Sequence, residues 1–388
     1  MRIAVASIGR FHVLDLAREL DRLGEEVLFY SYVPKRRAAR FGLPERCHRG
    51  ILGLVAPLVA AQRYAPRLAP GLQERAMAQA LNAAVIARMK PCDIFICMSG
   101  MYLEAARHAQ RRYGAQVWLE RGSRHILSQR EILTEVGAGR LPSDFIVRRE
   151  LEGYELADRI VVPASQVAES FEAQDARLSA KLFVNPYGVD LAQFPQRRAP
   201  QARPGPRTVL FVGGWSRRKG ADVLVEAIRR LQDVRLLHVG GLVDLPFPAG
   251  DERFSHVGPV PQWKLKDYYA QADVFALASR EEGLALVQAQ ALAGGLPLVC
   301  TSRTGGGDLA HTPTLARRIR VVAPDDVQAL AQALDMSLQS APDLPPLPDA
   351  DRATLDWTAY GARYHAALLG KYNCVIKGAH KSFSMESS

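Results

Sequence analysis

Cysteine is scarce in this chain of 388 residues, which has five cysteines and no Cys-x-x-Cys pair. No histidine lies at metal-ligand spacing from any of them, so the sequence predicts no structural zinc and a reducing compartment. The longest uncharged apolar run, residues 51–61, has 11 residues and includes Pro57, whereas a membrane span needs about 20. The first residues show no secretory leader. We therefore expect a cytoplasmic protein.

Several nucleotide and nucleic-acid signatures are missing as well. Gly9 stands alone in the first turn, without the Gly-x-Gly-x-x-Gly pattern of NAD enzymes, and no Gly-Lys-Ser/Thr phosphate loop occurs. The sequence has neither zinc-finger spacing nor an RNP-type aromatic motif, so no nucleic-acid partner is predicted. Asp349 and Asp351 stand isolated in a proline-rich segment. We expect no metal and no bound cofactor.

The composition is that of a globular α/β protein, with 48% hydrophobic and 23% charged residues, and the length suits two domains. Residues 2–34 read as a strand, a glycine turn, an amphipathic helix and a second strand. Proline-rich residues 195–206 are interpreted as the interdomain linker. The predicted units are an N-terminal domain (1–200), a C-terminal domain (207–355), a terminal helix returning to the first domain (356–373) and a tail (374–388).

The most informative segment is residues 281–308, in which an acid-Gly loop, a helix over 285–293, a Gly-Gly stop, a strand over 298–301 and a second glycine cluster follow in order. This order presents a phosphate-bearing ligand to helix N-termini at the end of a sheet. Glu282 and Gln290 are separated by seven residues. Here the chain resembles glycosyltransferase family 4, retaining enzymes of the GT-B fold, whose signature is Glu, seven residues and a second Glu. Gln290 departs from that signature.

A second segment, residues 208–231, combines an apolar strand, the turn GGWSRRKG and an amphipathic helix. Such a turn places cations and backbone N–H groups around a diphosphate. The family has Gly-Arg and then Lys-Gly here. Lys219 matches, whereas Gly214 occupies the Arg position, so either Arg217 or Arg218 is predicted to supply the second cation.

The resemblance extends to residues 182–195, an Asn-x-x-Gly-Val-Asp-type segment, and to 254–279, where a Gly-x-Val turn meets the nucleobase. It implies two Rossmann-like domains facing across a cleft. In that arrangement Glu282 holds the donor sugar, Lys219 neutralises the leaving diphosphate, and the leaving phosphate takes the acceptor proton. The predicted donor-binding residues are Gly213, Gly214, Arg217, Arg218, Gly258, Val260, Gly283, Leu284, Ala285, Gln290, Gly305 and Gly306.

The first half of the chain supplies acceptor-side candidates. The first loop faces the acceptor in the resembling family, which implicates Gly9, Arg10 and His12. The run Glu-Arg-Gly-Ser-x-His follows an apolar strand at residues 115–119, and ligands in open sheets bind beyond the carboxyl ends of strands. Arg121 and His125 are predicted to contact donor or acceptor. The alternative for His125 is to cap the next helix.

The net charge of +10 favours an acidic partner. Residues 35–75 carry nine Lys or Arg against two Glu and flank the apolar stretch 51–61. This pattern indicates docking on an anionic membrane surface, on the inner face of the cell membrane.

The sequence therefore predicts a retaining hexosyltransferase that moves a sugar from a UDP- or GDP-sugar to a carbohydrate or lipid-linked acceptor, in cell-surface polysaccharide or glycoconjugate synthesis. Two alternatives stay open. One is a sugar-nucleotide epimerase, which would act without an acceptor. The other is a non-catalytic sugar-nucleotide-binding subunit of a polysaccharide assembly complex.

Overall fold

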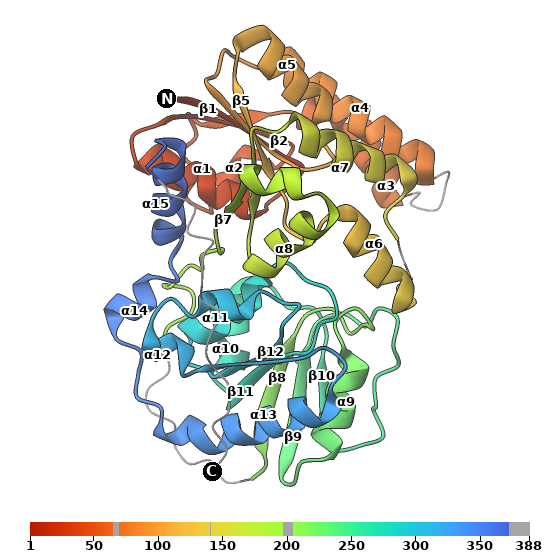
Figure 1. Ribbon diagram of the computed structural model, residues 1–388, viewed down its shortest axis with the longest axis vertical. Coiled ribbons are helices and arrows are strands. Elements are labelled where there is room, and N and C mark those ends of the chain that lie inside the picture. Colours follow the sequence, from red (N-terminus) through yellow and green to blue (C-terminus); the bar gives the residue numbers. More distant parts are fainter. Residues whose placement is uncertain (65–69, 140, 197–204, 372–388) are drawn as a thin grey trace.

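The computed structural model describes residues 1–64, 70–139, 141–196 and 205–371 (Figure 1). Most of the predicted linker, Cys374 and the predicted tail lie outside these ranges. Two parallel sheets with helices on their faces form two domains, one above the other in Figure 1. The predicted α/β class with two similar halves is confirmed.

The N-terminal sheet has seven parallel strands in the order β3-β2-β1-β4-β5-β6-β7. Its strands are β1 (Arg2–Ser7), β2 (Glu26–Ser31), β3 (His48–Gly50), β4 (Ile94–Met98), β5 (Gln116–Glu120), β6 (Arg159–Val162) and β7 (Leu182–Val184). Its helices are α1 (His12–Arg22), α2 (Lys35–Ala39), α3 (Leu52–Tyr64), α4 (Pro70–Arg88), α5 (Leu103–Tyr113), α6 (Ile126–Glu135), α7 (Asp144–Leu156), α8 (Ser165–Gln174) and the 3-10 helix η1 (Ala176–Lys181). Apolar side chains of the central strands are buried on both faces, as expected of a parallel sheet covered by helices.

The C-terminal sheet has six parallel strands in the order β10-β9-β8-β11-β12-β13. Its strands are β8 (Arg207–Val212), β9 (Val234–Val239), β10 (Phe254–Val257), β11 (Val274–Leu277), β12 (Leu298–Thr301) and β13 (Ile319–Val322). Its helical segments are α9 (Ala221–Arg229), η2 (Gln262–Lys264), α10 (Leu265–Tyr269), α11 (Leu286–Ala293), η3 (Gly306–Leu309), α12 (Pro313–Ala316), α13 (Val327–Ser340), η4 (Ala341–Asp343) and α14 (Asp349–Ala353). The strand predicted over 298–301 is β12, and the helix predicted over 285–293 is α11 without its first residue.

The last described helix, α15 (Trp357–Leu368), packs against α1 of the N-terminal domain. Figure 1 shows it in dark blue beside the red α1. The approach is close, because a Cβ on Gly361 would lie 2.4 Å from the Cβ of Glu19. A bridge between Val189 and Asp356 sets the start of α15 beside the segment that follows β7. The chain therefore crosses back to its first domain at the cleft.

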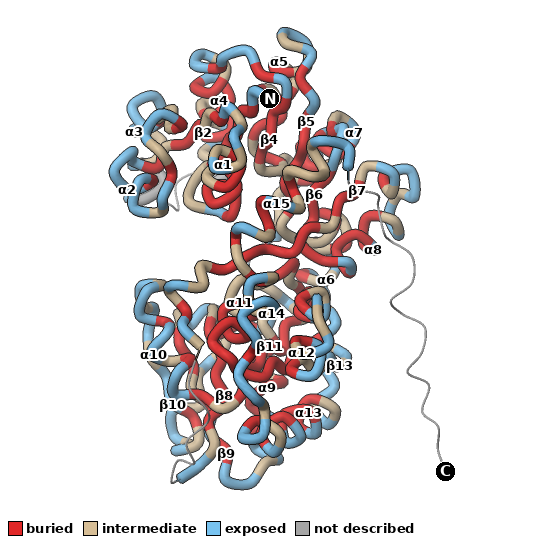
Figure 2. The backbone as a smooth tube through the Cα atoms, turned by 90° about the vertical axis from the view of Figure 1, so that its left-hand side faces the viewer, coloured by how far each residue is buried: buried red, intermediate tan, exposed pale blue. Residues whose placement is uncertain are grey.

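The two domains touch through loops at the carboxyl ends of their strands. Gln166 donates to the carbonyls of Glu282 (2.8 Å) and Gly283 (3.1 Å). A Cβ on Gly283 would lie 2.0 Å from the carbonyl oxygen of Gly122, so only glycine permits this contact. Figure 2 shows that the chain is also buried where the two domains meet. The carboxyl ends of both sheets consequently face each other, which is where open α/β sheets bind ligands.

The four cysteines within the described ranges are all buried and free. Among the helices that the structure describes, none has the length and apolar character needed to cross a membrane.

Candidate active site

The turn after β8, residues 213–220, is shaped by glycine. Gly220 has φ +64°, and a Cβ there would lie 2.0 Å from the carbonyl oxygen of Ala278 at the end of β11. The backbone N–H of Lys219 donates to the carbonyl of Ser216 (3.1 Å), which closes the turn. Lys219 and its neighbour Arg218 are thus fixed where β8 and β11 end.

Glu282 follows β11 and forms an ion pair with the Nζ of Lys219. Nη1 of Arg218 lies 3.4 Å from the same carboxylate oxygen. Burial alone would raise the pKa of Glu282, but the charges of Lys219 and Arg218 outweigh it and lower the pKa. The carboxylate is therefore ionised, and the two cations meet it where the resemblance places the donor diphosphate and sugar.

Of the two arginines proposed for the second cation, the structure places Arg218 at this cluster. The Arg217 side chain is exposed, and its backbone supports the turn: the N–H donates to Asp244 (2.9 Å), and the carbonyl accepts from the N–H of Gly220 (3.0 Å). Arg218, in contrast, reaches both Glu281 (3.2 Å) and Glu282.

Glu281 is a second carboxylate at this point, and its side chain is fully buried. Besides its contact with Arg218, it accepts a hydrogen bond from the hydroxyl of Ser123 in the other domain. Gln129 of α6 donates to the same oxygen at 3.4 Å. Glu281 thereby ties Arg218 to the N-terminal domain.

The second glycine cluster lies against the interdomain contact. Gly305 has φ +69°, and a Cβ there would lie 2.6 Å from both Ala164 Cβ and the carbonyl oxygen of Gly283. A Cβ on Gly306 would lie 2.5 Å from Cys300 Sγ and from Gln288 Nε2. The cluster is therefore required for close packing of three loops at the end of β12.

Gln290 lies on α11 with its side chain buried, and its Oε1 is 3.0 Å from the hydroxyl of Tyr269. Burial raises the pKa of Tyr269 well above its usual value, so the phenol stays protonated and can donate. Gln290 borders the cavity described next, which is the position that the resemblance gives to the ribose.

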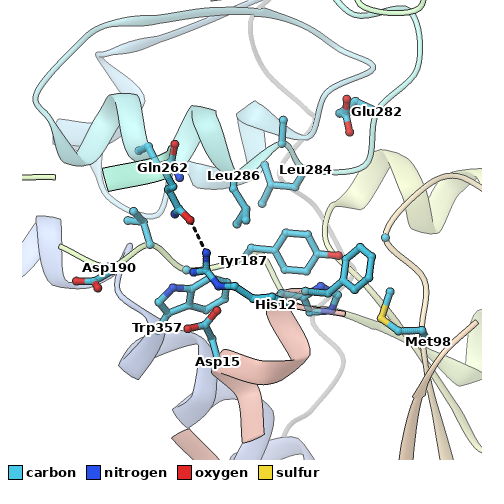
Figure 3. A pocket seen from close by; sticks show the side chains of 17 residues that line it. His12, Asp15, Met98, Tyr187, Asp190, Gln262, Glu282, Leu284, Leu286 and Trp357 are labelled. Atoms are coloured by element: carbon cyan, nitrogen blue, oxygen red, sulfur yellow. Dashed lines mark hydrogen bonds between the residues drawn. The ribbon is translucent and has the colours of Figure 1, made fainter. Parts of the chain in front are cut away.

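A cavity of about 480 Å³ lies between the domains (Figure 3). Its lining residues come from strand ends, loops and helices at the carboxyl ends of both sheets, from residues 187–190 after β7, and from α15. They are Arg10, Phe11, His12, Asp15, Met98, Gly122, Tyr187, Gly188, Val189, Asp190, Gln262, Glu282, Leu284, Ala285, Leu286, Gln290 and Trp357. In Figure 3 Glu282 and Leu284 enter from the C-terminal domain, and His12 and Asp15 from the N-terminal domain. A cavity of this size suits a small polar ligand.

Several predicted residues meet in this lining: Glu282, Leu284, Ala285 and Gln290 from the donor set, and Arg10 and His12 from the acceptor set. Arg10 also bridges the domains, since its Nη1 donates to Oε1 of Gln262 at 2.5 Å. Gly258 and Val260 follow β10 and do not border the cavity, nor do the glycines 9, 213, 214, 305 and 306.

Arg121 and His125 lie outside the lining, in the core of the N-terminal domain. Arg121 pairs with Glu150 (2.9 Å) and donates to the carbonyl of Arg124 (2.7 Å). His125 caps α6 and packs between Tyr154 and Phe171, each ring 5.0 Å away. Burial lowers the pKa of His125 to about 4, so it is neutral. The geometry thus corresponds to the capping alternative, and contact of either residue with substrate stays a prediction.

The sequence interpretation missed residues that border or support the cavity, among them Asp15, Tyr187, Glu281 and Trp357. Tyr187 lies inside the segment already singled out at residues 182–195, and Glu281 is next to Glu282. Asp15 and Trp357 carried no local signal. Among the residues that the structure describes, no group of three or more His, Cys, Asp or Glu could hold a metal ion.

Comparison with known proteins places these features in context. The family model described as "Glycosyl transferases group 1" matches residues 206–340. The TuaC protein of Bacillus subtilis, named as a teichuronic acid biosynthesis glycosyltransferase, is 35% identical over 133 residues, which are 33% of this chain and 32% of TuaC. The matched stretch thus spans about a third of that relative.

Two solved structures share the whole architecture. Sucrose-phosphate synthase from Thermosynechococcus elongatus has a TM-score of 0.70 at 19% identity, and the match covers 95% of this chain and 98% of that one. Anabaena HepE in complex with UDP-glucose has a TM-score of 0.63 at 14% identity, covering 95% of this chain and 100% of that one. The chain therefore has the GT-B fold, and residues 206–340 within its C-terminal domain match the model of the glycosyl transferases of group 1.

Proposed function

We propose that this protein is a glycosyltransferase that moves a hexosyl group from a nucleotide-sugar donor to a hydroxyl of a carbohydrate or lipid-linked acceptor, with retention. The observation that carries the proposal is the ionised Glu282 held by Lys219 and Arg218 at the rim of the interdomain cavity. Two cations at the carboxyl ends of β8 and β11 can stabilise a leaving diphosphate as its charge develops. Glu282 can then accept hydrogen bonds from sugar hydroxyls.

The printed names of similar proteins also support this assignment. HepE was solved with UDP-glucose, which makes a UDP-hexose the first donor to test. TuaC is named for teichuronic acid biosynthesis, which supports a role in cell-surface polysaccharide synthesis. The wall of the cavity around Arg10 carries aromatic side chains and two carboxylates, Asp15 and Asp190. That wall favours an acceptor without a phosphate at the reacting end.

The first prediction concerns the donor. In a thermal-shift panel of UDP-, GDP- and dTDP-sugars, one nucleotide is expected to stabilise the protein selectively, because a ligand at a hundred times its Kd adds about 2.7 kcal/mol. Release of free nucleoside diphosphate should follow with that donor. Binding without turnover under every acceptor tried would favour the binding-subunit alternative, and isomerised donor would favour an epimerase.

The matched variant for this panel is Gln290→Glu. A carboxylate can keep the hydrogen bond from Tyr269 and present its second oxygen to the ribose. We expect the Kd of the selected nucleotide sugar to fall about fivefold, corresponding to about 1 kcal/mol for a charge-assisted bond. An unchanged Kd, measured by calorimetry, would mean that Gln290 does not contact the ribose.

We also propose that the N-terminal domain docks on an anionic membrane surface. Exposed cations of α2 and the loop after it include Arg36, Arg37 and Arg40, and α3 exposes Leu54. The protein is expected to co-sediment with phosphatidylglycerol vesicles at low salt and to be released at high salt, since each such cation contributes about 1 kcal/mol. Equal recovery with phosphatidylcholine vesicles would contradict this proposal.

A further inference from the structure

A buried carboxylate at the domain boundary holds one of the two donor-side cations. Glu281 lies fully buried in the loop after β11, and its Oε2 accepts from Nη1 of Arg218 at 3.2 Å. Its other oxygen, Oε1, accepts from the hydroxyl of Ser123 and from Nε2 of Gln129 (3.4 Å), which both belong to the N-terminal domain. The carboxylate therefore has donors from both domains.

The direction of the bond from Ser123 follows from its neighbour. Nε2 of Gln129 donates to the hydroxyl oxygen of Ser123 at 3.0 Å, so the hydroxyl proton is left for Glu281. A carboxylate that is shielded from water needs such donors. Within the described residues, the donors to Oε1 come from the N-terminal domain alone. Glu281 consequently has its full set of hydrogen bonds only where the two domains meet.

Arg218 depends on this loop for its position. Its Nη1 donates to the carbonyl oxygen of Glu281 at 3.1 Å, in addition to the carboxylates of Glu281 and Glu282. A long arginine side chain loses rotamer freedom when it is fixed, and bonds that fix it in advance lower that cost for a ligand. Among the described residues, every hydrogen bond of this side chain uses Nη1. Nε and Nη2 can therefore donate to a diphosphate.

The two adjacent glutamates differ in what they reach. Glu282 borders the cavity and pairs with Lys219 as well as Arg218. Glu281 does not border the cavity, and within the described part of the chain its ion pair is with Arg218 alone. Any effect of Glu281 on a ligand in the cavity must therefore pass through Arg218.

We propose that Glu281 is a positioning residue through which Ser123 of the N-terminal domain sets the place of Arg218, an inference that rests on the proposed glycosyltransferase function. Ser123 and Gln129 fix the carboxylate, and the carboxylate fixes the guanidinium. A cation held in advance stabilises the charge that develops on the leaving diphosphate. Donor cleavage thereby depends on a side chain of the opposite domain, although the cation itself belongs to the C-terminal domain.

The test measures release of UDP from UDP-glucose by the whole chain, with water in place of the acceptor. If the donor panel selects another nucleotide sugar, that one replaces UDP-glucose. Ser123→Ala removes the hydroxyl and leaves every residue of the C-terminal domain unchanged. We expect kcat/KM to fall about tenfold, because one hydrogen bond to a charged group is lost.

Ser165→Ala is the matched control. The hydroxyl of Ser165 also donates to a carboxylate across the domain boundary, that of Asp308, and neither residue borders the cavity. This variant should keep kcat/KM within about twofold of wild type. Equal losses in Ser123→Ala and Ser165→Ala would overturn the assignment, because domain contact in general, rather than Glu281, would then control turnover.

Double variants separate positioning from general support of the fold. If Ser123 acts through Arg218, Ser123→Ala should change kcat/KM by less than about twofold once Arg218→Ala is already present. Glu281→Gln supplies a second background, which serves even where Arg218→Ala does not fold. Its amide has one acceptor oxygen for two donors, Ser123 and Arg218, so it should lose at least as much kcat/KM as Ser123→Ala. Adding Ser123→Ala to Glu281→Gln should again change little.

The outcomes distinguish this inference from the proposed function. If wild type releases UDP and Ser123→Ala either has no effect or lowers kcat/KM by the same factor in all backgrounds, the positioning role is overturned and the glycosyltransferase function stands. If wild type neither binds nor hydrolyses any nucleotide sugar, the proposed function fails and the positioning role fails with it.

Discussion

Lys219→Ala is expected to lower kcat/KM for the nucleotide sugar by about 10²- to 10³-fold, the loss seen when one preorganised charge-stabilising group is removed. The Lys219 side chain is only 12% exposed, and its ammonium already sits against Glu282 at the rim of the cavity. Its charge is therefore in place before the donor arrives. Steady-state release of nucleoside diphosphate measures the effect.

Two comparisons make this prediction specific. Arg218→Ala should resemble Lys219→Ala, because Arg218 contacts the same carboxylate, whereas Arg217→Ala should cost much less because its side chain is exposed. Lys266→Ala removes an exposed lysine of α10 and serves as the control for net charge. If Lys219→Ala kept wild-type kcat/KM, the turn after β8 would not be the diphosphate site.

The turns that hold Lys219 and Glu282 could be predicted because their structural requirements are local. The glycines at 220 and 283 would each bring a Cβ within 2.0 Å of a backbone carbonyl oxygen, so no other residue fits there. Such positions can be recognised in the sequence, because each required glycine stands directly after a charged residue: Gly220 after Lys219 and Gly283 after Glu282. The helix predicted over 285–293 corresponds to α11, and the strand predicted over 298–301 corresponds to β12.

The N-terminal wall of the cavity could not be predicted in the same way, because it is built by contacts between distant segments. The Glu120–Tyr364 hydrogen bond joins residues 244 positions apart, and the Arg10–Gln262 bond joins residues 252 apart. The sequence showed that Arg10 and His12 follow a strand, but not which side chains would surround them. Glu120 ends β5, whereas its partners come from α1 and α15.

The run Glu-Arg-Gly-Ser-x-His illustrates how position after a strand can mislead. Glu120 is the last residue of β5 and the other members follow it, yet the structure divides them between different environments. Glu120 supports the cavity through His12, and Ser123 contacts Glu281 across the domain boundary. Arg121 and His125 turn into the N-terminal core instead. A strand end places residues near a ligand, but the following loop decides which side chains reach it.

Arg121→Ala is accordingly expected to act on stability, lowering the free energy of unfolding by about 3 to 5 kcal/mol. The side chain of Glu150 is 4% exposed, and one of its oxygens accepts from both Arg121 (2.9 Å) and Ser99 (3.0 Å). Its other oxygen, Oε2, has no hydrogen-bond partner within the described residues. Removing the guanidinium would therefore leave a buried charge supported by one hydroxyl. Chemical denaturation measures the loss.

The double variant Arg121→Met with Glu150→Gln separates this role from catalysis. It removes both charges and keeps most of the buried volume, so it should recover much of the stability lost by Arg121→Ala. If Arg121 has only this structural role, the double variant will also turn over donor at nearly the wild-type rate at a temperature where it is folded. A double variant that is stable but at least a hundredfold slower would show that the Arg121 guanidinium acts on the substrate after all.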